Sequence, residues 1–172
     1  MLILGVDPGS RATGWGAIRC DGPEVRLVEA GTLTPPAADP LPRRLAALAA
    51  GIGEIADRLR PATAVLESPF HGMNARSLIV LAQARGALIA ALAARDVEVR
   101  EFTPAEVKSA VAGSGRAGKP EVARMVRLLL AMRGDGAGAA LSTDASDALA
   151  VALCCARRLR HDRISELHGR SK

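Results

Sequence analysis

The sequence predicts a single α/β domain built on a five-stranded mixed sheet, in which three antiparallel strands are followed by two parallel ones and helices flank the sheet. Two observations support this fold class. Up to Leu33, short apolar runs alternate with turn residues, as in a β-meander. Beyond that point, segments with apolar residues at helical spacing alternate with short apolar runs, as in strand–helix–strand units.

The N-terminal part of the chain predicts three antiparallel strands, at residues 2–7, 13–20 and 25–33. The turn sequences Asp7-Pro8-Gly9 and Asp21-Gly22-Pro23 separate them. After a Pro-rich stretch, apolar residues at helical spacing predict a helix over residues 43–60 that crosses the sheet.

Residues 63–67 form a short buried-type strand, and its connection through a helix predicts parallel pairing. A helix over residues 74–94 and a strand over 97–102 follow. Thr103-Pro104-Ala105-Glu106 has the residues of a helix start, with a capping Thr, Pro at the first helical position and an acid at the third. Further helices are predicted over residues 120–132 and 144–160, so the domain spans 1–160 and is followed by a basic, flexible tail over 161–172.

The composition is that of an ordinary globular protein, with 49% apolar and 24% charged residues among 172, which excludes fibrous and disordered classes. No run of eighteen uncharged apolar residues and no signal sequence is present, so we expect a cytoplasmic protein without a membrane span. The three cysteines, Cys20, Cys154 and Cys155, lack the spacing of a zinc site or a disulfide framework and are expected to be buried or half-buried thiols.

The net charge of +5 suits a polyanionic partner, although a merely basic enzyme would have it too. The chain has only three lysines, at positions 108, 119 and 172, among many arginines. Lys108 and Lys119 therefore stand out as positions that need a compact ammonium group, unless they are chance survivors on a solvated helix. The glycine loop over residues 113–119 lacks the Lys-Ser/Thr ending of a phosphate-binding P-loop and follows a helix, which argues against a nucleotide site.

Four carboxylates are candidate metal ligands. Asp7 and Glu67 each end an apolar strand, and Asp144 and Asp147 lie three residues apart on one helix face. Each has a structural alternative: Asp7 as a turn cap, Glu67 as a solvated strand end, and Asp144 as an acid stabilised by the helix dipole. Asp147 has the weakest alternative, because the residues around it are apolar.

Carboxylates that are brought together repel one another unless a cation compensates them. Oxygen ligands select magnesium or manganese, and a pair of such ions about 3.5–4 Å apart is typical of phosphodiester hydrolysis. The sequence therefore predicts a metal-dependent hydrolase of phosphodiester bonds.

An ordered set of motifs resembles the RuvC family of Holliday-junction resolvases. The resemblance spans nearly the whole chain up to about Arg160. It rests on Asp7-Pro8-Gly9-Ser10-Arg11 with Thr13-Gly14-Trp15-Gly16, on Glu67 with Phe70 and Asn74, on Gln83-Ala84-Arg85-Gly86, on Val107-Lys108, and on Asp144-Ala145-Ser146-Asp147-Ala148-Leu149-Ala150.

This resemblance implies a ribonuclease H-like homodimer that resolves four-way DNA junctions in homologous recombination and DNA repair. Such an enzyme nicks two strands of like polarity symmetrically, with two Mg²⁺ ions per active site and Mn²⁺ as an expected substitute. The family's metal-binding acids map onto Asp7, Glu67, Asp144 and Asp147, and its catalytic, phosphate-contacting lysines onto Lys108 and Lys119. The resemblance also places Phe70 on a base and Arg76 near phosphate, and it implies RuvA and RuvB as partners. Phe70 as a loop anchor, and Arg76 and Arg85 as parts of a solvated helix face, are the alternatives.

Three other functions fit parts of the pattern. A YqgF-like nuclease of the same fold shares the strand-one Asp and the late Asp but lacks the stretch from Phe70 to Gly86. One half of an actin-like ATPase or sugar kinase has Asp-x-Gly after its first strand, but these enzymes need two such domains. A non-catalytic junction-binding scaffold would be expected to have lost at least one acid, and all four acids are present.

Overall fold

The computed structural model of the protein describes residues 1–68, 74–132 and 141–169. A five-stranded sheet has the strand order β3-β2-β1-β4-β5. Its strands are β1 (Leu2–Asp7), β2 (Thr13–Asp21), β3 (Glu24–Leu33), β4 (Thr63–Glu67) and β5 (Glu98–Phe102). The helices are α1 (Leu41–Leu59), α2 (Ala75–Ala93), α3 (Pro104–Ala112), α4 (Lys119–Leu129) and α5 (Thr143–Gly169).

The pairing of the strands confirms the predicted mixed sheet. β1 pairs antiparallel with β2, and β2 pairs antiparallel with β3. β1 and β4 are parallel, as are β4 and β5. β1 and β4 are therefore neighbouring parallel strands, and their carboxyl ends lie side by side at one edge of the sheet.

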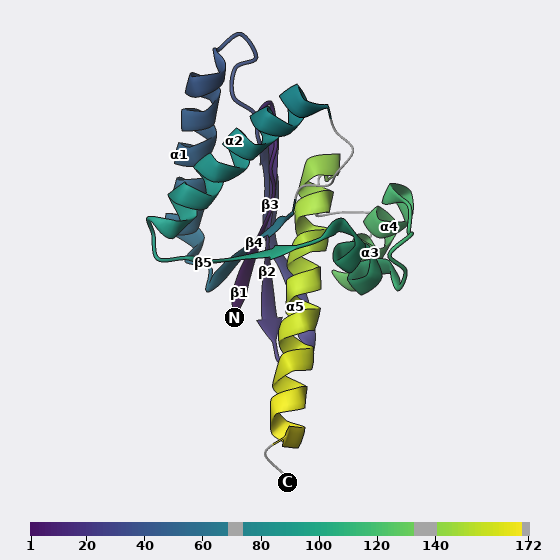
Figure 1. Ribbon diagram of the computed structural model, residues 1–172. Coiled ribbons are helices and arrows are strands. Elements are labelled where there is room, and N and C mark those ends of the chain that lie inside the picture. Colours follow the sequence, from purple (N-terminus) through teal and green to yellow (C-terminus); the bar gives the residue numbers. More distant parts are fainter. Residues whose placement is uncertain (69–73, 133–140, 170–172) are drawn as a thin grey trace.

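Helices cover both faces of the sheet (Figure 1). On one face, α1 and α2 pack over a core that includes Leu4, Leu66 and Leu88. On the other face, α5 lies along the sheet with α3 and α4 beside it, over a core that includes Ile3 and Val65. Because side chains alternate along a strand, the odd-numbered residues of β1 and β4 point toward α5.

Glycines on β1 and β2 allow α5 to lie directly on the sheet. A Cβ added to Gly5 would lie 1.9 Å from the carbonyl oxygen of Ala148, and one added to Gly14 would lie 2.0 Å from that of Asp144. Real Cβ atoms do not approach other atoms so closely, so the backbone of α5 can take this position only above glycine. The start of α5 is thereby fixed over the ends of β1 and β2.

Helix α5 is longer than predicted, because it continues past Arg160 to Gly169. The polar composition of residues 161–169 predicts a tail, whereas adding residues to the end of a long, packed helix costs little free energy per residue. The cysteines are as predicted: Cys154 and Cys155 are buried, and Cys20 is half-buried.

Helix α2 is long and apolar enough to cross a membrane by length and composition alone, and only 22% of its most apolar window is buried. Its buried residues, Ala84, Arg85, Leu88 and Leu92, form one stripe along the helix. The stripe packs onto the sheet and α1 as in a globular protein. On the remaining surface of α2, Ile79 is 59% exposed.

Candidate active site

Asp7 and Glu67 end neighbouring parallel strands. Val6 of β1 pairs with Leu66 of β4, so the two acids occupy equivalent positions just beyond that pair. Ile3 and Val65, at odd positions of the same strands, lie in the core under α5. Asp7 and Glu67 therefore face α5 from adjacent strand ends, where in-register residues lie about 4.7–4.9 Å apart.

The turn after Asp7 is fixed by Thr13. The fully buried Thr13 hydroxyl donates to the Gly9 carbonyl at 2.9 Å and accepts from the Gly9 amide at 3.4 Å. These bonds close the loop between β1 and β2, so the Asp-Pro-Gly turn holds the end of β1 in one conformation.

Helix α5 supplies the other two acids. Its N-terminal end is tied down by Ser142, whose hydroxyl accepts from the Ala145 amide at 3.1 Å and lies 2.6 Å from the Thr32 hydroxyl on β3. Together with the close approach at Gly14, these contacts bring the first turns of α5, which carry Asp144 and Asp147, over the end of β1.

Five charged side chains, Asp7, Glu67, Asp147, Lys108 and Lys119, line one pocket of about 60 Å³. One water needs only about 10–15 Å³, so the pocket has room for more than a single small ligand. Asp144 does not line this pocket, but its charge acts on Asp7. Lys108 lies on α3, whose start has the predicted capping box between Thr103 and Glu106.

Burial and neighbouring charges raise the pKa values of Asp7 and Glu67. Burial raises the pKa of Asp7 to about 7, and the charges of Asp147, Asp144 and Glu67 add to this rise, while Lys119 opposes it. Burial and Asp147 also raise the pKa of Glu67, whereas Lys119, Lys108 and Arg85 lower it. The pocket thus holds more negative charge than its two lysines neutralise.

Within residues 1–68, 74–132 and 141–169, no three Asp, Glu, His or Cys side chains converge closely enough to form a ready-made metal site. The expectation that the acids meet as a tight cluster is not met in this structure. Asp147 instead forms an ion pair with Lys119, at 3.0 Å between Nζ and Oδ2. Carboxylates without a cation between them repel, and a nearby ammonium group is the available counter-charge.

The residues of the pocket nevertheless fit a divalent metal ion. Their donors are carboxylate oxygens, which hard cations such as Mg²⁺ and Mn²⁺ prefer. Burial and the neighbouring acids raise the pKa of Asp7 more than Lys119 lowers it, so a cation bound at this carboxylate would favour its charged form. Asp7, Glu67 and Asp147 are the acids of the pocket that could hold such an ion, and the charge of Asp144 on α5 also acts on Asp7.

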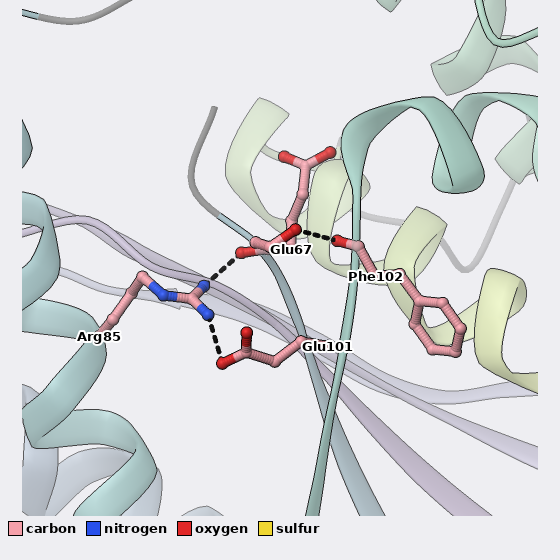
Figure 2. A network of polar contacts seen from close by, with 5 residues as sticks. Glu67, Arg85, Glu101 and Phe102 are labelled. Carbon is pink, nitrogen blue, oxygen red and sulfur yellow. Dashed lines mark hydrogen bonds and ion pairs between the residues drawn. The ribbon is translucent and has the colours of Figure 1, made fainter. Parts of the chain in front are cut away.

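The remaining predicted residues have different outcomes. Phe70 lies outside the described residues. Arg76 is exposed in the first turn of α2. Arg85 is not on a solvated face: its side chain is buried and contacts the backbone carbonyl of Glu67 and the carboxylate of Glu101 (Figure 2). The spacing of Arg85, Leu88 and Leu92 on one helix face was the signal in the sequence for this burial.

The chain is similar to proteins of one known family. A family model described as "Crossover junction endodeoxyribonuclease RuvC" matches residues 3–155. The enzyme of that name from Polynucleobacter asymbioticus is 46% identical over 159 residues, which cover 91% of this chain and 88% of the relative. The one from Chloroflexus aggregans is 44% identical, with 90% of this chain and 92% of the relative covered.

Among solved structures, "T. thermophilus RuvC in complex with Holliday junction substrate" superimposes with a TM-score of 0.84 at 30% identity, covering 94% of this chain and 96% of that chain. The fold is ribonuclease H-like, as the resemblance in the sequence implied. Family model, relatives and structural neighbour agree, and the chain therefore belongs to the RuvC family of crossover junction endodeoxyribonucleases, which are metal-dependent nucleases.

Proposed function

We propose that this protein resolves Holliday junctions by nicking two strands of like polarity symmetrically, in homologous recombination and DNA repair. The observation that carries the proposal is the single pocket in which Asp7, Glu67 and Asp147 lie with Lys108 and Lys119. A family member from T. thermophilus has been solved with a Holliday junction, which supports the same substrate here.

Asp7, Glu67, Asp144 and Asp147 are the proposed ligands of two Mg²⁺ ions, with Mn²⁺ as a substitute. When bound, such ions supply Lewis-acid activation of the attacking water and of the leaving oxygen. The protein's part is to hold these carboxylates at fixed places: two on adjacent strand ends, and two on a helix that is locked onto the sheet by glycines.

Lys119 and Lys108 are the proposed contacts to the scissile phosphate. Lys119 is 76% exposed at the rim of the pocket, so its ammonium group can reach a bound strand while remaining close to the acids. Asp147 is its partner in this structure, and a metal ion at that carboxylate would leave the lysine available for phosphate. Lys108 approaches the same pocket from α3.

Symmetric cleavage needs two active sites, so we propose a homodimer. Helix α2, whose apolar surface includes the exposed Ile79, is the proposed interface. Arg76, at the start of this helix, and Phe70 are the proposed contacts to phosphate and to a base. RuvA and RuvB are proposed partners, and the cytoplasm is the proposed location.

The test is incubation of the protein with a synthetic mobile four-way junction, a linear duplex and an RNA–DNA hybrid, each with Mg²⁺, Mn²⁺ or chelator. We expect paired nicks in the junction alone, symmetrically placed and ligatable, with either metal and not with chelator. Cleavage of the hybrid instead would favour a different nuclease of this fold, and binding without cleavage in both metals would favour a non-catalytic scaffold.

A further inference from the structure

Arg85 is the only charged residue that is buried among the residues described, with 6% of its surface exposed. It lies on α2, on the sheet face opposite to α5 and the metal pocket. A long apolar side chain at this position would pack into the core beside Leu88 and Leu92 of the same helix face. Burying a guanidinium group has a large desolvation cost, so its presence calls for a specific contact.

The contacts of Arg85 converge on the end of β4 (Figure 2). One guanidinium nitrogen donates to the backbone carbonyl of Glu67, and another donates to Oε1 of Glu101 on β5 at 2.7 Å. This planar fork can hold two acceptors in a fixed relative position, which an ammonium group cannot do. Arg85 thus joins α2 to the last residue of β4 and to its neighbouring strand.

Both polar groups of the peptide bond between Glu67 and Ser68 form hydrogen bonds. Arg85 binds the Glu67 carbonyl, and the next residue, Ser68, donates its amide to the Phe102 carbonyl at 2.8 Å and its hydroxyl to the same oxygen at 3.1 Å. Figure 2 shows the Glu67 carboxylate extending away from Arg85. The backbone is therefore fixed from the α2 side while the carboxylate reaches the metal pocket on the other side.

We infer that Arg85 is a positioning residue for Glu67, which sets the place of this metal ligand by clamping the end of β4 to β5 and α2. The inference rests on the proposed function of Glu67 as a metal ligand. Groups that orient ligands without touching the metal commonly change metal affinity by about 10–100-fold when they are removed. Through this contact, the position of α2 on one face of the sheet influences the geometry of the pocket on the opposite face.

The experiment compares Arg85→Met and Arg85→Lys with a matched control, Arg95→Met. Arg95 likewise joins elements, through a 2.9 Å ion pair with Asp57 of α1, but it lies in the turn after the C-terminal end of α2 and lines no part of the pocket. Two quantities are measured: the affinity for Mn²⁺ by calorimetry without DNA, and the Mg²⁺ concentration for half-maximal cleavage of a saturating junction. Thermal melting reports the fold of each variant.

We expect Arg85→Met to bind Mn²⁺ about 10–100-fold more weakly and to need correspondingly more Mg²⁺. Arg85→Lys should recover part of this loss, because a lysine can make one of the two contacts. Junction binding in chelator should stay unchanged, and Arg95→Met should match the wild-type protein in metal affinity. Wild-type metal affinity in Arg85→Met, or an equal loss in Arg95→Met, would overturn the inference.

If Arg85→Met does not fold, Glu101→Gln carries the test. The Glu101 side chain is 46% exposed and keeps its acceptor oxygen in this variant, so only the charge of the clamp is lost. A smaller loss of Mn²⁺ affinity in the same direction is expected, and an unchanged affinity would refute the clamp. Because the Mn²⁺ measurement needs no DNA, failure of the wild-type protein to cut junctions would overturn the proposed function without deciding this inference.

Discussion

Substitution of Gly5 by alanine tests whether the contact between α5 and the sheet sets the geometry of the metal site. The new Cβ would lie 1.9 Å from the Ala148 carbonyl oxygen, and ordinary contact begins near 3.4 Å. The helix or the strand must therefore move by about 1.5 Å, the difference between these two distances. The displaced residue, Ala148, follows Asp147 directly, and Gly5 is two residues from Asp7.

Two consequences follow from a shift of this size. Overpacking a core costs about 1–3 kcal/mol, which for a protein of this length lowers the melting temperature by roughly 2–12 °C. A displacement of about 1 Å in a catalytic site can cost about 10²-fold in rate. We expect Gly5→Ala to fold, to bind junctions, and to cleave them at least about 100-fold more slowly than the wild-type protein.

The assay is single-turnover cleavage of a junction at fixed Mg²⁺, with melting and junction affinity measured in parallel. Gly16→Ala is the matched control, because its Cβ would meet the Leu149 side chain of the same helix, at 2.5 Å, instead of backbone. A side chain can adjust its rotamer, so this variant should lose stability but keep most of its activity. A folded Gly5→Ala that cleaves as fast as Gly16→Ala would refute the reasoning.

Four further results are expected. Asp7→Asn should bind junctions but not cleave them with Mg²⁺. This variant should also melt at a higher temperature than the metal-free wild-type protein at pH 8, because the buried Asp7 carboxylate, with a pKa of about 7, is charged at that pH and its charge destabilises the fold. For the same reason, the stability of the metal-free wild-type protein should decline as the pH rises from about 4 to 7. Because protons compete with the metal ion for Asp7, the Mg²⁺ concentration for half-maximal cleavage should rise as the pH falls below 7. A Mg²⁺ requirement that stays constant between pH 6 and 8 would contradict this. Lys119→Ala should slow cleavage more than it weakens binding, and an effect on affinity alone would make Lys119 a simple phosphate anchor. Thr103→Ala should lose about 1 kcal/mol of stability in denaturant unfolding with little change in metal affinity, since it removes a helix cap and no pocket residue.

Most of the fold was predictable because its signals are local. The alternation and turns before Leu33, the short run ending at Glu67 and the capping box at Thr103 each fix an element by themselves, and the observed bounds differ from the predicted ones by a few residues at most ends. The end of α5 was the exception. Its last turns have no apolar pattern and no stop signal before Gly169, so a composition-based interpretation ended the helix too early.

The identity of the candidate acids could be predicted, but their arrangement could not. That Asp7 and Glu67 end strands is visible in the sequence, whereas their adjacency depends on β4 pairing with β1. The pairing of Lys119 with Asp147 depends on the side-chain positions of two helices that are far apart in the sequence. The clamp formed by Arg85 was missed because an arginine on an amphipathic helix is usually solvated.

The lock between α5 and β1 also has a consequence for synthesis. Asp7 emerges from the ribosome first, but Asp144 and Asp147 follow 137 and 140 positions later, which at about 5–20 residues per second is roughly 7–28 s. During that interval the growing polypeptide carries at most two of its four proposed metal ligands and cannot assemble the reaction centre. A DNA-cutting activity is thus withheld until Asp147 has been translated, and any product truncated before Thr143 should be harmless to the chromosome.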